Sequence, residues 1–159
     1  VVGQPSPRVK KMFDAVLDVQ TRVLDSISAG TQASKMMSLA CDLFEQRRFK
    51  TIRAVLNGDK DATRRGFIHS LGHGVGLTSG ERPQLSLFSD ETLRSRHVVT
   101  IEPGLYEPEV GGVRIEDTVV ITETGCENLT AGIPRTVKDI QELMKKPGIP
   151  QVLKKAGLY

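Results

Sequence analysis

The chain has 159 residues, enough for one domain of ordinary size, or a large part of one, with a buried core. Lys and Arg number 22 against 19 Asp and Glu, and this excess of +3 is weak evidence for nucleic acid as a partner. With 38% hydrophobic and 26% charged residues, the composition favours a globular protein and excludes a disordered tail or a coiled-coil rod. No apolar stretch approaches the ~20 residues of a membrane span, and no signal sequence is recognisable. We therefore expect neither nucleic acid nor a membrane as a partner.

The two cysteines give information about the compartment. Cys41 and Cys126 lie far apart in the sequence and match no metal-binding or redox spacing. We expect both to be buried free thiols in a reducing compartment, which favours a cytoplasmic location.

The first part of the chain predicts two helices. Between positions 9 and 27, apolar residues recur at three- and four-residue steps, which is typical of an amphipathic helix. Ser6 is placed to cap this helix, Pro7 fits its first position, and Gly30 is placed to end it. The same pattern predicts a second helix over roughly 34–47.

The second part of the chain predicts mainly extended structure. Five of the 15 glycines fall within 66–80, where the backbone is expected to take unusual dihedral angles or to approach another group closely. Segments 98–102 and 113–122 are rich in Val, Ile and Thr and are predicted strands, and 103–112 is a predicted loop by its Pro and Gly content. A last helix is expected over 136–146. The fold class is therefore α+β.

Three ionisable residues lie where their neighbours make a charge costly. His73 is flanked by glycines, Glu102 ends an apolar strand, and Glu116 lies within another apolar run. A carboxylate in such a run is costly unless it is paired or coordinates a cation. Strand alternation places Arg114 on the same face as Glu116, so an Arg–Glu pair with a solvated Glu102 is the alternative to a metal site.

The order of these residues adds a resemblance. The segments FIHSLGHGVGL (67–77), VTIEPGLY (99–106) and GVRIED (112–117) resemble three motifs of the pita-bread metallopeptidases. This family includes prolidase, aminopeptidase P, methionine aminopeptidase and creatinase. The Glu-Pro-Gly-Leu-Tyr form is similar to that of the Xaa-Pro branch. The resemblance implies an α+β pita-bread fold and metal-dependent hydrolysis of short peptides with proline at the second position, as by an Xaa-Pro dipeptidase or aminopeptidase.

The resemblance also implies roles for individual residues. Family members bind two divalent ions through two Asp, one His and two Glu, and His73, Glu102 and Glu116 match three of these ligands. Carboxylates with one imidazole suit Mn, Co, Fe or Zn. By the same resemblance, Arg114 orients the Glu116 carboxylate, and His69 lines the substrate pocket and acts in catalysis together with Glu102. A packed loop histidine remains the alternative for His69.

The sequence departs from the family at its start. The two Asp ligands of the family lie upstream of a Val-Gly-x-Pro-Ser segment, which here occupies 2–6, and Asp14, Asp18 and Asp25 lie within the first predicted helix. We therefore interpret 1–159 as a single domain that is the C-terminal portion of a pita-bread domain, N-terminally incomplete. Partial metal occupancy at most, inactivity of this chain alone, and self-association or pairing with the missing N-terminal part are expected.

A second departure concerns Gly80. The family places a histidine here, which is implied to contact the substrate, in a His-Glu-x-Pro setting, whereas this chain has Gly80-Glu81-Arg82-Pro83. Loss of such a group typically lowers the rate by ~10²–10⁴. The alternative function is therefore a non-catalytic pita-bread protein that binds peptides in the same cleft.

Overall fold

A computed structural model describes residues 3–78, 80–148 and 154–155, so that Val1, Val2 and Ser79 of the segments quoted above lie outside it. The helices are α1 (Pro7–Ser26), α2 (Ala33–Gln46), α3 (Ile52–Leu56), the 3₁₀ turn η1 (Asp61–Thr63) and α4 (Val137–Met144). The strands are β1 (Gly72–Gly74), β2 (Glu81–Leu85), β3 (Val98–Ile101), β4 (Gly104–Glu107), β5 (Gly111–Arg114), β6 (Asp117–Ile121) and β7 (Cys126–Asn128). The predicted α+β class is confirmed. Within these residues, no helix is both long and apolar enough to cross a membrane.

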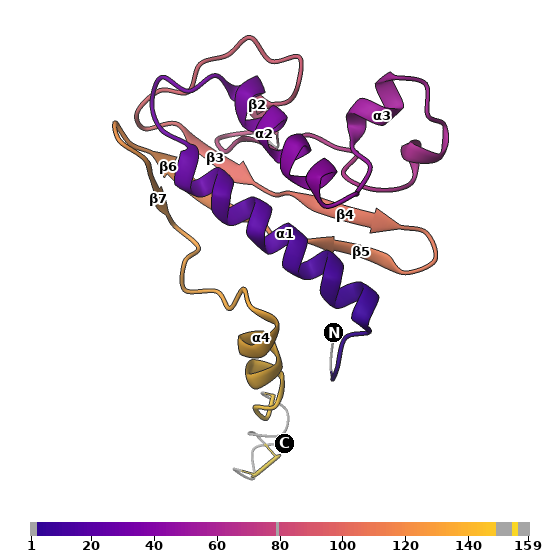
Figure 1. The fold of residues 1–159 in the computed structure, drawn as a ribbon. Helices are drawn as coiled ribbons and strands as arrows, with labels where there is room; N and C mark the ends of the chain where they lie inside the picture. Colours follow the sequence, from indigo (N-terminus) through magenta and orange to yellow (C-terminus); the bar gives the residue numbers. More distant parts are fainter. Residues whose placement is uncertain (1–2, 79, 149–153, 156–159) are drawn as a thin grey trace.

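The strands form one sheet and one hairpin. Five antiparallel strands are ordered β2-β1-β3-β6-β7, and β4 pairs with β5 as a separate two-stranded hairpin. Figure 1 shows α1 running diagonally across β3 and the hairpin, α2 beside β2, and α4 away from the sheet. The strands β1, β3 and β6, each of which carries residues of one family-like motif, are therefore neighbours in the five-stranded sheet.

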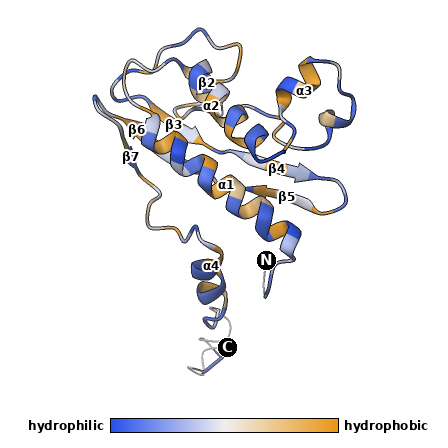
Figure 2. Cartoon of the chain, in the orientation of Figure 1, coloured by the Kyte–Doolittle hydropathy of each residue, from blue (hydrophilic) through white to orange (hydrophobic). Residues whose placement is uncertain are grey.

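The start of α1 confirms the predicted cap. The Ser6 hydroxyl accepts a hydrogen bond from the Val9 amide at 3.3 Å, and Pro7 occupies the first turn, where its missing N–H costs nothing. The helix ends at Ser26, before Gly30, which takes a positive φ of 86° in the following turn. Figure 2 shows hydrophobic and hydrophilic residues alternating around α1, and the hydrophobic stripe faces the sheet.

The core lies between the two long helices and the sheet. Its largest fully buried side chains include Phe44, Phe67, Met12, Ile27, Met37, Leu71, Leu85, Leu93, Ile101, Leu105 and Ile121. Cys41 belongs to this core, and burial raises the pKa of its thiol to about 11, so the prediction of a buried thiol is confirmed there. It is wrong for Cys126, which is half-buried at the edge strand β7, although both thiols are free.

Two predictions for the second half of the chain are wrong. Segment 103–112 is not a loop but contains β4 and the start of β5, and segment 113–122 is not one strand because residues 115 and 116 separate β5 from β6. The glycines explain the error. Gly112 lies opposite Tyr106, and a Cβ atom there would come within 2.7 Å of the Tyr106 ring. This glycine therefore permits strand pairing beside a large ring, and does not mark a turn.

The glycine-rich segment does meet the expectation of close approach. A Cβ atom at Gly72 would lie 1.9 Å from the Thr100 carbonyl oxygen, and one at Gly74 would lie 2.2 Å from that of Arg82. Both glycines belong to β1, which lies between β2 and β3. The absence of side chains at these two positions lets the strand that carries His73 pack tightly between its neighbours.

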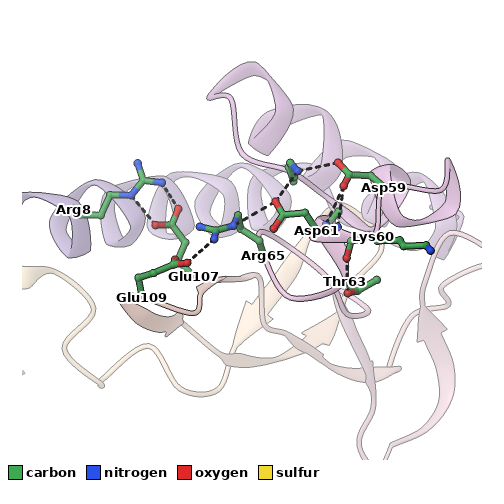
Figure 3. A network of polar contacts seen from close by, with 10 residues as sticks. Arg8, Asp59, Lys60, Asp61, Thr63, Arg65, Glu107 and Glu109 are labelled. Carbon is green, nitrogen blue, oxygen red and sulfur yellow. Dashed lines mark hydrogen bonds and ion pairs between the residues drawn. The ribbon is translucent and has the colours of Figure 1, made fainter.

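Ion pairs tie the β4–β5 hairpin to the start of α1 and to the segment that follows α3. We call the following seven residues the ion-pair network: Arg8, Lys50, Asp59, Asp61, Arg65, Glu107 and Glu109. Figure 3 labels all of them except Lys50. Arg8 at the start of α1 donates from Nε to the buried Glu107 of β4 at 2.8 Å, and Arg65 contacts Glu109 at 2.8 Å. These contacts hold the turn of the β4–β5 hairpin against α1 and the segment that follows α3.

Candidate active site

The structure brings two of the three proposed ligands together directly. His73 lies in the middle of β1, and Glu102 follows the last residue of the neighbouring strand β3. The distance from His73 Nε2 to Glu102 Oε1 is 3.4 Å. The two side chains are 29% and 12% exposed, so they face a partly solvated space and not the core.

The His73 ring is oriented by its own backbone. Its Nδ1 lies 2.9 Å from the Gly74 carbonyl oxygen, and a carbonyl can only accept a hydrogen bond. Nδ1 therefore carries the proton, and in the neutral ring the lone pair is on Nε2, the atom that faces Glu102. A hydrogen bond from the other ring nitrogen to a carbonyl is the usual way in which proteins orient a histidine for metal binding.

Thr100 joins these two residues and was not predicted from the sequence. Its hydroxyl donates to Glu102 Oε1 at 3.0 Å and accepts from the His73 amide at 3.0 Å. The side chain thus fixes the Glu102 carboxylate relative to the β1 backbone. Strand alternation supplies a signal that could have found it, because positions 100 and 102 point to the same face.

Glu116 is connected to this pair through Arg114. The guanidinium lies 3.7 Å from Glu102 Oε2 through Nε and 3.4 Å from Glu116 Oε2 through Nη2. Burial lowers the pKa of Arg114, but a hydrogen bond to Tyr106 and the charges of both glutamates outweigh this, and its pKa is raised. We call these four residues the ligand cluster: His73, Glu102, Arg114 and Glu116. Within the described part of the chain, no three His, Cys, Asp or Glu side chains converge closely enough to hold a metal ion.

His69 lies beside Tyr106, the last residue of the Glu-Pro-Gly-Leu-Tyr motif. Its Nδ1 lies 2.7 Å from the Ser70 carbonyl oxygen, so Nδ1 is the donor and Nε2 accepts from the Tyr106 hydroxyl at 3.2 Å. Tyr106 also helps to raise the pKa of Arg114, so His69 and the ligand cluster have this tyrosine as a common neighbour. The sequence missed Tyr106 as a site residue, although it belongs to the Glu-Pro-Gly-Leu-Tyr motif.

A small apolar cavity lies beside His69. It has a volume of about 170 Å³, and its lining includes Met37, Ile52, Ile68, His69, Leu87 and Phe88. Phe88 is 78% exposed at the cavity rim. An exposed aromatic ring and aliphatic side chains next to a polar cluster are typical of a site for a small ligand with an apolar group.

Gly80 lies in an open loop between β1 and β2. Its φ is +69° and the residue is half-buried. No heavy atom lies within 4 Å of the place where a Cβ would be. Glu81 holds the preceding part of this loop, since its carboxylate accepts from the Thr78 amide at 3.2 Å and from its hydroxyl at 3.3 Å. A larger side chain at Gly80 therefore has space but takes an unfavourable backbone conformation.

The donor set fits part of a divalent-metal site. The unprotonated Nε2 of His73 faces the Glu102 carboxylate, and the Arg114 guanidinium lies between Glu102 and the second carboxylate, Glu116. Imidazole nitrogen and carboxylate oxygen are ligands that Mn, Co, Fe and Zn accept. The cluster carries two negative charges and one positive charge, so its excess charge is also of the right sign. Two ligands in direct reach are too few for two ions.

Comparison with known proteins places this geometry in a family. Residues 1–123 match the model of metallopeptidase family M24 (Peptidase_M24). The chain belongs to metallopeptidase family M24. The resemblance drawn from the three motifs is thereby confirmed, and so is the pita-bread fold, because the similar solved structures of this family are prolidases and aminopeptidases.

Individual M24 relatives agree with this assignment. The chain is 40% identical over 130 residues to the Xaa-Pro dipeptidase of Pyrococcus furiosus, which covers 82% of this chain and 33% of the relative. An X-Pro aminopeptidase structure from Thermotoga maritima superposes with a TM-score of 0.70 at 36% identity, covering 85% of this chain and 34% of that one. An Xaa-Pro dipeptidase structure from Bacillus anthracis gives a TM-score of 0.72 at 34% identity, covering 86% and 34%. The chain thus spans about a third of the length of the M24 relatives it matches, their C-terminal part.

Proposed function

We propose that this chain is part of a metal-dependent peptidase that hydrolyses short peptides with proline at the second position. The observation that carries the proposal is the 3.4 Å approach of His73 Nε2 to Glu102 Oε1, with Nδ1 held by a carbonyl. The relatives named Xaa-Pro dipeptidase and X-Pro aminopeptidase support this substrate class. The apolar cavity beside His69 supports it further, because a proline ring is a small apolar group.

The residues of the chain have distinct roles in this proposal. His73, Glu102 and Glu116 are metal ligands, and Arg114 orients the two carboxylates by contacting both. When bound, two divalent ions supply the Lewis acidity for attack of water on the peptide carbonyl. His69 holds the proton on Nδ1, so its Nε2 accepts a hydrogen bond, here from Tyr106 and in the complex from the substrate. Glu102 takes part in both metal binding and proton transfer.

The remaining ligands are proposed to come from outside this chain. Three candidate ligands are too few for two ions, and the family resemblance places two Asp ligands upstream of position 2. We therefore expect this chain alone to bind fewer than two ions and to leave Xaa-Pro peptides uncleaved. Pairing with the upstream part of the domain would complete the site.

The test compares this chain alone with the chain joined to its upstream sequence. Isothermal titration with Mn²⁺ measures stoichiometry, and release of proline from an Xaa-Pro dipeptide measures activity. We expect fewer than two ions and no release for the chain alone, and two ions with measurable release for the joined form. Two ions bound by the chain alone, or no metal bound by the joined form, would contradict the proposal.

A second function is favoured by one observation, which is glycine at position 80. The family places a substrate-contacting histidine there, and the open space around Gly80 contains no other described side chain that replaces it. A non-catalytic protein that binds proline-containing peptides in the same cleft would have this feature. It predicts that the joined form binds an Xaa-Pro peptide in calorimetry without releasing proline, even with both ions bound.

A further inference from the structure

A buried amide on α1 contacts the backbone beside both proposed glutamate ligands. Gln20 is fully buried, and its Nε2 donates to the Ile101 carbonyl at 3.1 Å and to the Ile115 carbonyl at 3.0 Å. Ile101 directly precedes Glu102, and Ile115 directly precedes Glu116. One side chain therefore joins the two backbone segments that carry the carboxylates of the ligand cluster.

These contacts lie where the strand pairing is interrupted. The β3–β6 ladder ends at the pair Ile101–Asp117, and the β4–β5 hairpin begins at the pair Gly104–Arg114. Glu102 and Glu116 lie in the interval between the two ladders, where neither belongs to a strand. Regular pairing therefore does not set the separation of the two glutamates, and Gln20 spans this interval from the helix side.

We propose that Gln20 is a positioning residue for Glu102 and Glu116. This inference rests on the proposed function, in which both carboxylates are metal ligands. A peptide unit is planar, so a hydrogen bond that fixes the Ile101 carbonyl also fixes the following amide and the direction in which Glu102 leaves the backbone. The same holds for Ile115 and Glu116. Two like charges repel each other, and fixed backbone on both sides keeps them convergent before a cation arrives.

The other end of the amide distinguishes positioning from simple packing. Both groups near Nε2 are carbonyl oxygens, which only accept hydrogen bonds, so the amide cannot be turned round without placing oxygen against oxygen. Oε1 is then buried and has no hydrogen-bond partner among the described residues. An unpaired buried acceptor costs free energy. An apolar residue, like its neighbours Val16, Val19 and Val23, would fill the same space without this cost.

A metal-free experiment on this chain tests the proposal. Gln20→Met keeps the length of the side chain and removes both donated hydrogen bonds, and Val23→Ala is the matched control because it loosens the same buried face without touching the two carbonyls. Hydrogen exchange is followed at two amides of the site and one distant amide. The two site amides are those of Glu102, which donates to the Leu71 carbonyl, and Ile115, which donates to the Pro103 carbonyl. The distant amide is that of Ile121, which donates to the His97 carbonyl.

Local positioning predicts an uneven loss of protection. In Gln20→Met, exchange of the Glu102 and Ile115 amides accelerates roughly tenfold more than that of Ile121. A tenfold change corresponds to the net free energy of about one hydrogen bond. In Val23→Ala, all three accelerate alike. Gln20→Glu, whose protonated form retains one donor, falls between wild type and Gln20→Met. Equal acceleration at all three amides in Gln20→Met would overturn the proposal and leave Gln20 as a packing residue.

Metal binding separates this inference from the proposed function. We expect Gln20→Met to weaken Mn²⁺ binding by roughly 10–100-fold, as is typical when a residue that orients a ligand is removed. If wild type shows no Mn²⁺-induced broadening of the His73 and Glu102 resonances, the proposed metal site is wrong, while the exchange result still decides whether Gln20 fixes the two backbone segments. If wild type binds Mn²⁺ and Gln20→Met binds it equally well, the positioning role is wrong.

Discussion

The ligand cluster and the ion-pair network are both groups of charged side chains, but their charges are arranged differently. In the ion-pair network each carboxylate has a cation of opposite charge in contact: Glu107 with Arg8, Glu109 with Arg65, and Asp59 and Asp61 with Lys50. In the ligand cluster two carboxylates share one guanidinium, and the histidine presents a lone pair. Both groups have one negative charge in excess, but the distances differ. In the network Lys50 and Arg65 lie 2.8–2.9 Å from their carboxylates, whereas the guanidinium of the cluster lies 3.4 Å and 3.7 Å from its two carboxylates and leaves their oxygens available to a cation.

The two groups also differ in how they are held. The network is held by its own ion pairs, and all its members except Glu107 are about a third or more exposed. The cluster is held by short strands, two close-packed glycines, the Thr100 hydroxyl and the Gln20 amide. Surface ion pairs contribute little to stability, so a group whose carboxylates are fixed by strand and helix contacts but loosely paired points to function more than a large ionic network does.

The largest difference is expected in metal binding. We predict that Glu102→Gln lowers the Mn²⁺ affinity of this chain at least roughly 100-fold, because an amide oxygen lacks the charge that draws the cation. The matched control, Glu109→Gln in the ion-pair network, should leave the affinity unchanged. Titration calorimetry measures both. Similar losses in the two variants would mean that Mn²⁺ binds to general surface charge.

The next effect concerns stability within the ion-pair network itself. Arg8→Met removes the partner of Glu107, whose side chain is only 8% exposed, and should destabilise the fold by about 1–3 kcal/mol because a buried carboxylate loses its donor. Arg65→Met leaves Glu109, which is 66% exposed and can turn to water, so the urea midpoint should stay unchanged. Equal midpoints for both variants would show that burial of Glu107 does not matter.

A smaller effect is expected at Gly80, in the loop between β1 and β2. Gly80→Ala and Gly80→His should each cost about 1 kcal/mol, because φ is +69° and there is open space for either side chain. Urea unfolding of the two variants measures this cost. In the form joined to its upstream sequence, Gly80→His should raise kcat and kcat/KM together while Mn²⁺ affinity remains the same. A much larger cost for His than for Ala would show that the imidazole collides with the loop.

The contrast between the two groups also shows what the sequence could predict. His73, Glu102 and Glu116 could be proposed as ligands because each lies in a short motif with glycine, proline or apolar neighbours, and these motifs also gave the family. Tyr106 and Thr100 lie inside the same motifs, but their partners depend on which strands become neighbours. Gln20 could not be found, since a single amide on an apolar helix face carries no signal and its partners lie 81 and 95 residues further along the chain.

The sequence predicted the long helices correctly and the strands less well. Caps and spacing are local, so Ser6 and Thr136 correctly marked the starts of α1 and α4. The β4–β5 hairpin was predicted as a loop because glycine is typical of both turns and crowded strands. Only the pairing of Gly112 with Tyr106 distinguishes the two cases, and that pairing is a tertiary contact.

The smallest effect is expected from pH, and only in the ion-pair network. Hydrogen bonds from Lys50 lower the pKa of Asp59 and of Asp61 below the ordinary value of 3.8. A lowered carboxyl pKa in the folded state contributes stability that is present above the ordinary pKa and is lost as the pH falls through the folded-state value. Wild type should therefore exceed Lys50→Met in urea midpoint at pH 6 by a small margin that salt reduces, and this margin should vanish below about pH 3. A margin that persists at pH 2.5 would mean that Lys50 stabilises the fold through packing of its alkyl chain, and the network would then resemble the ligand cluster in being held by more than charge.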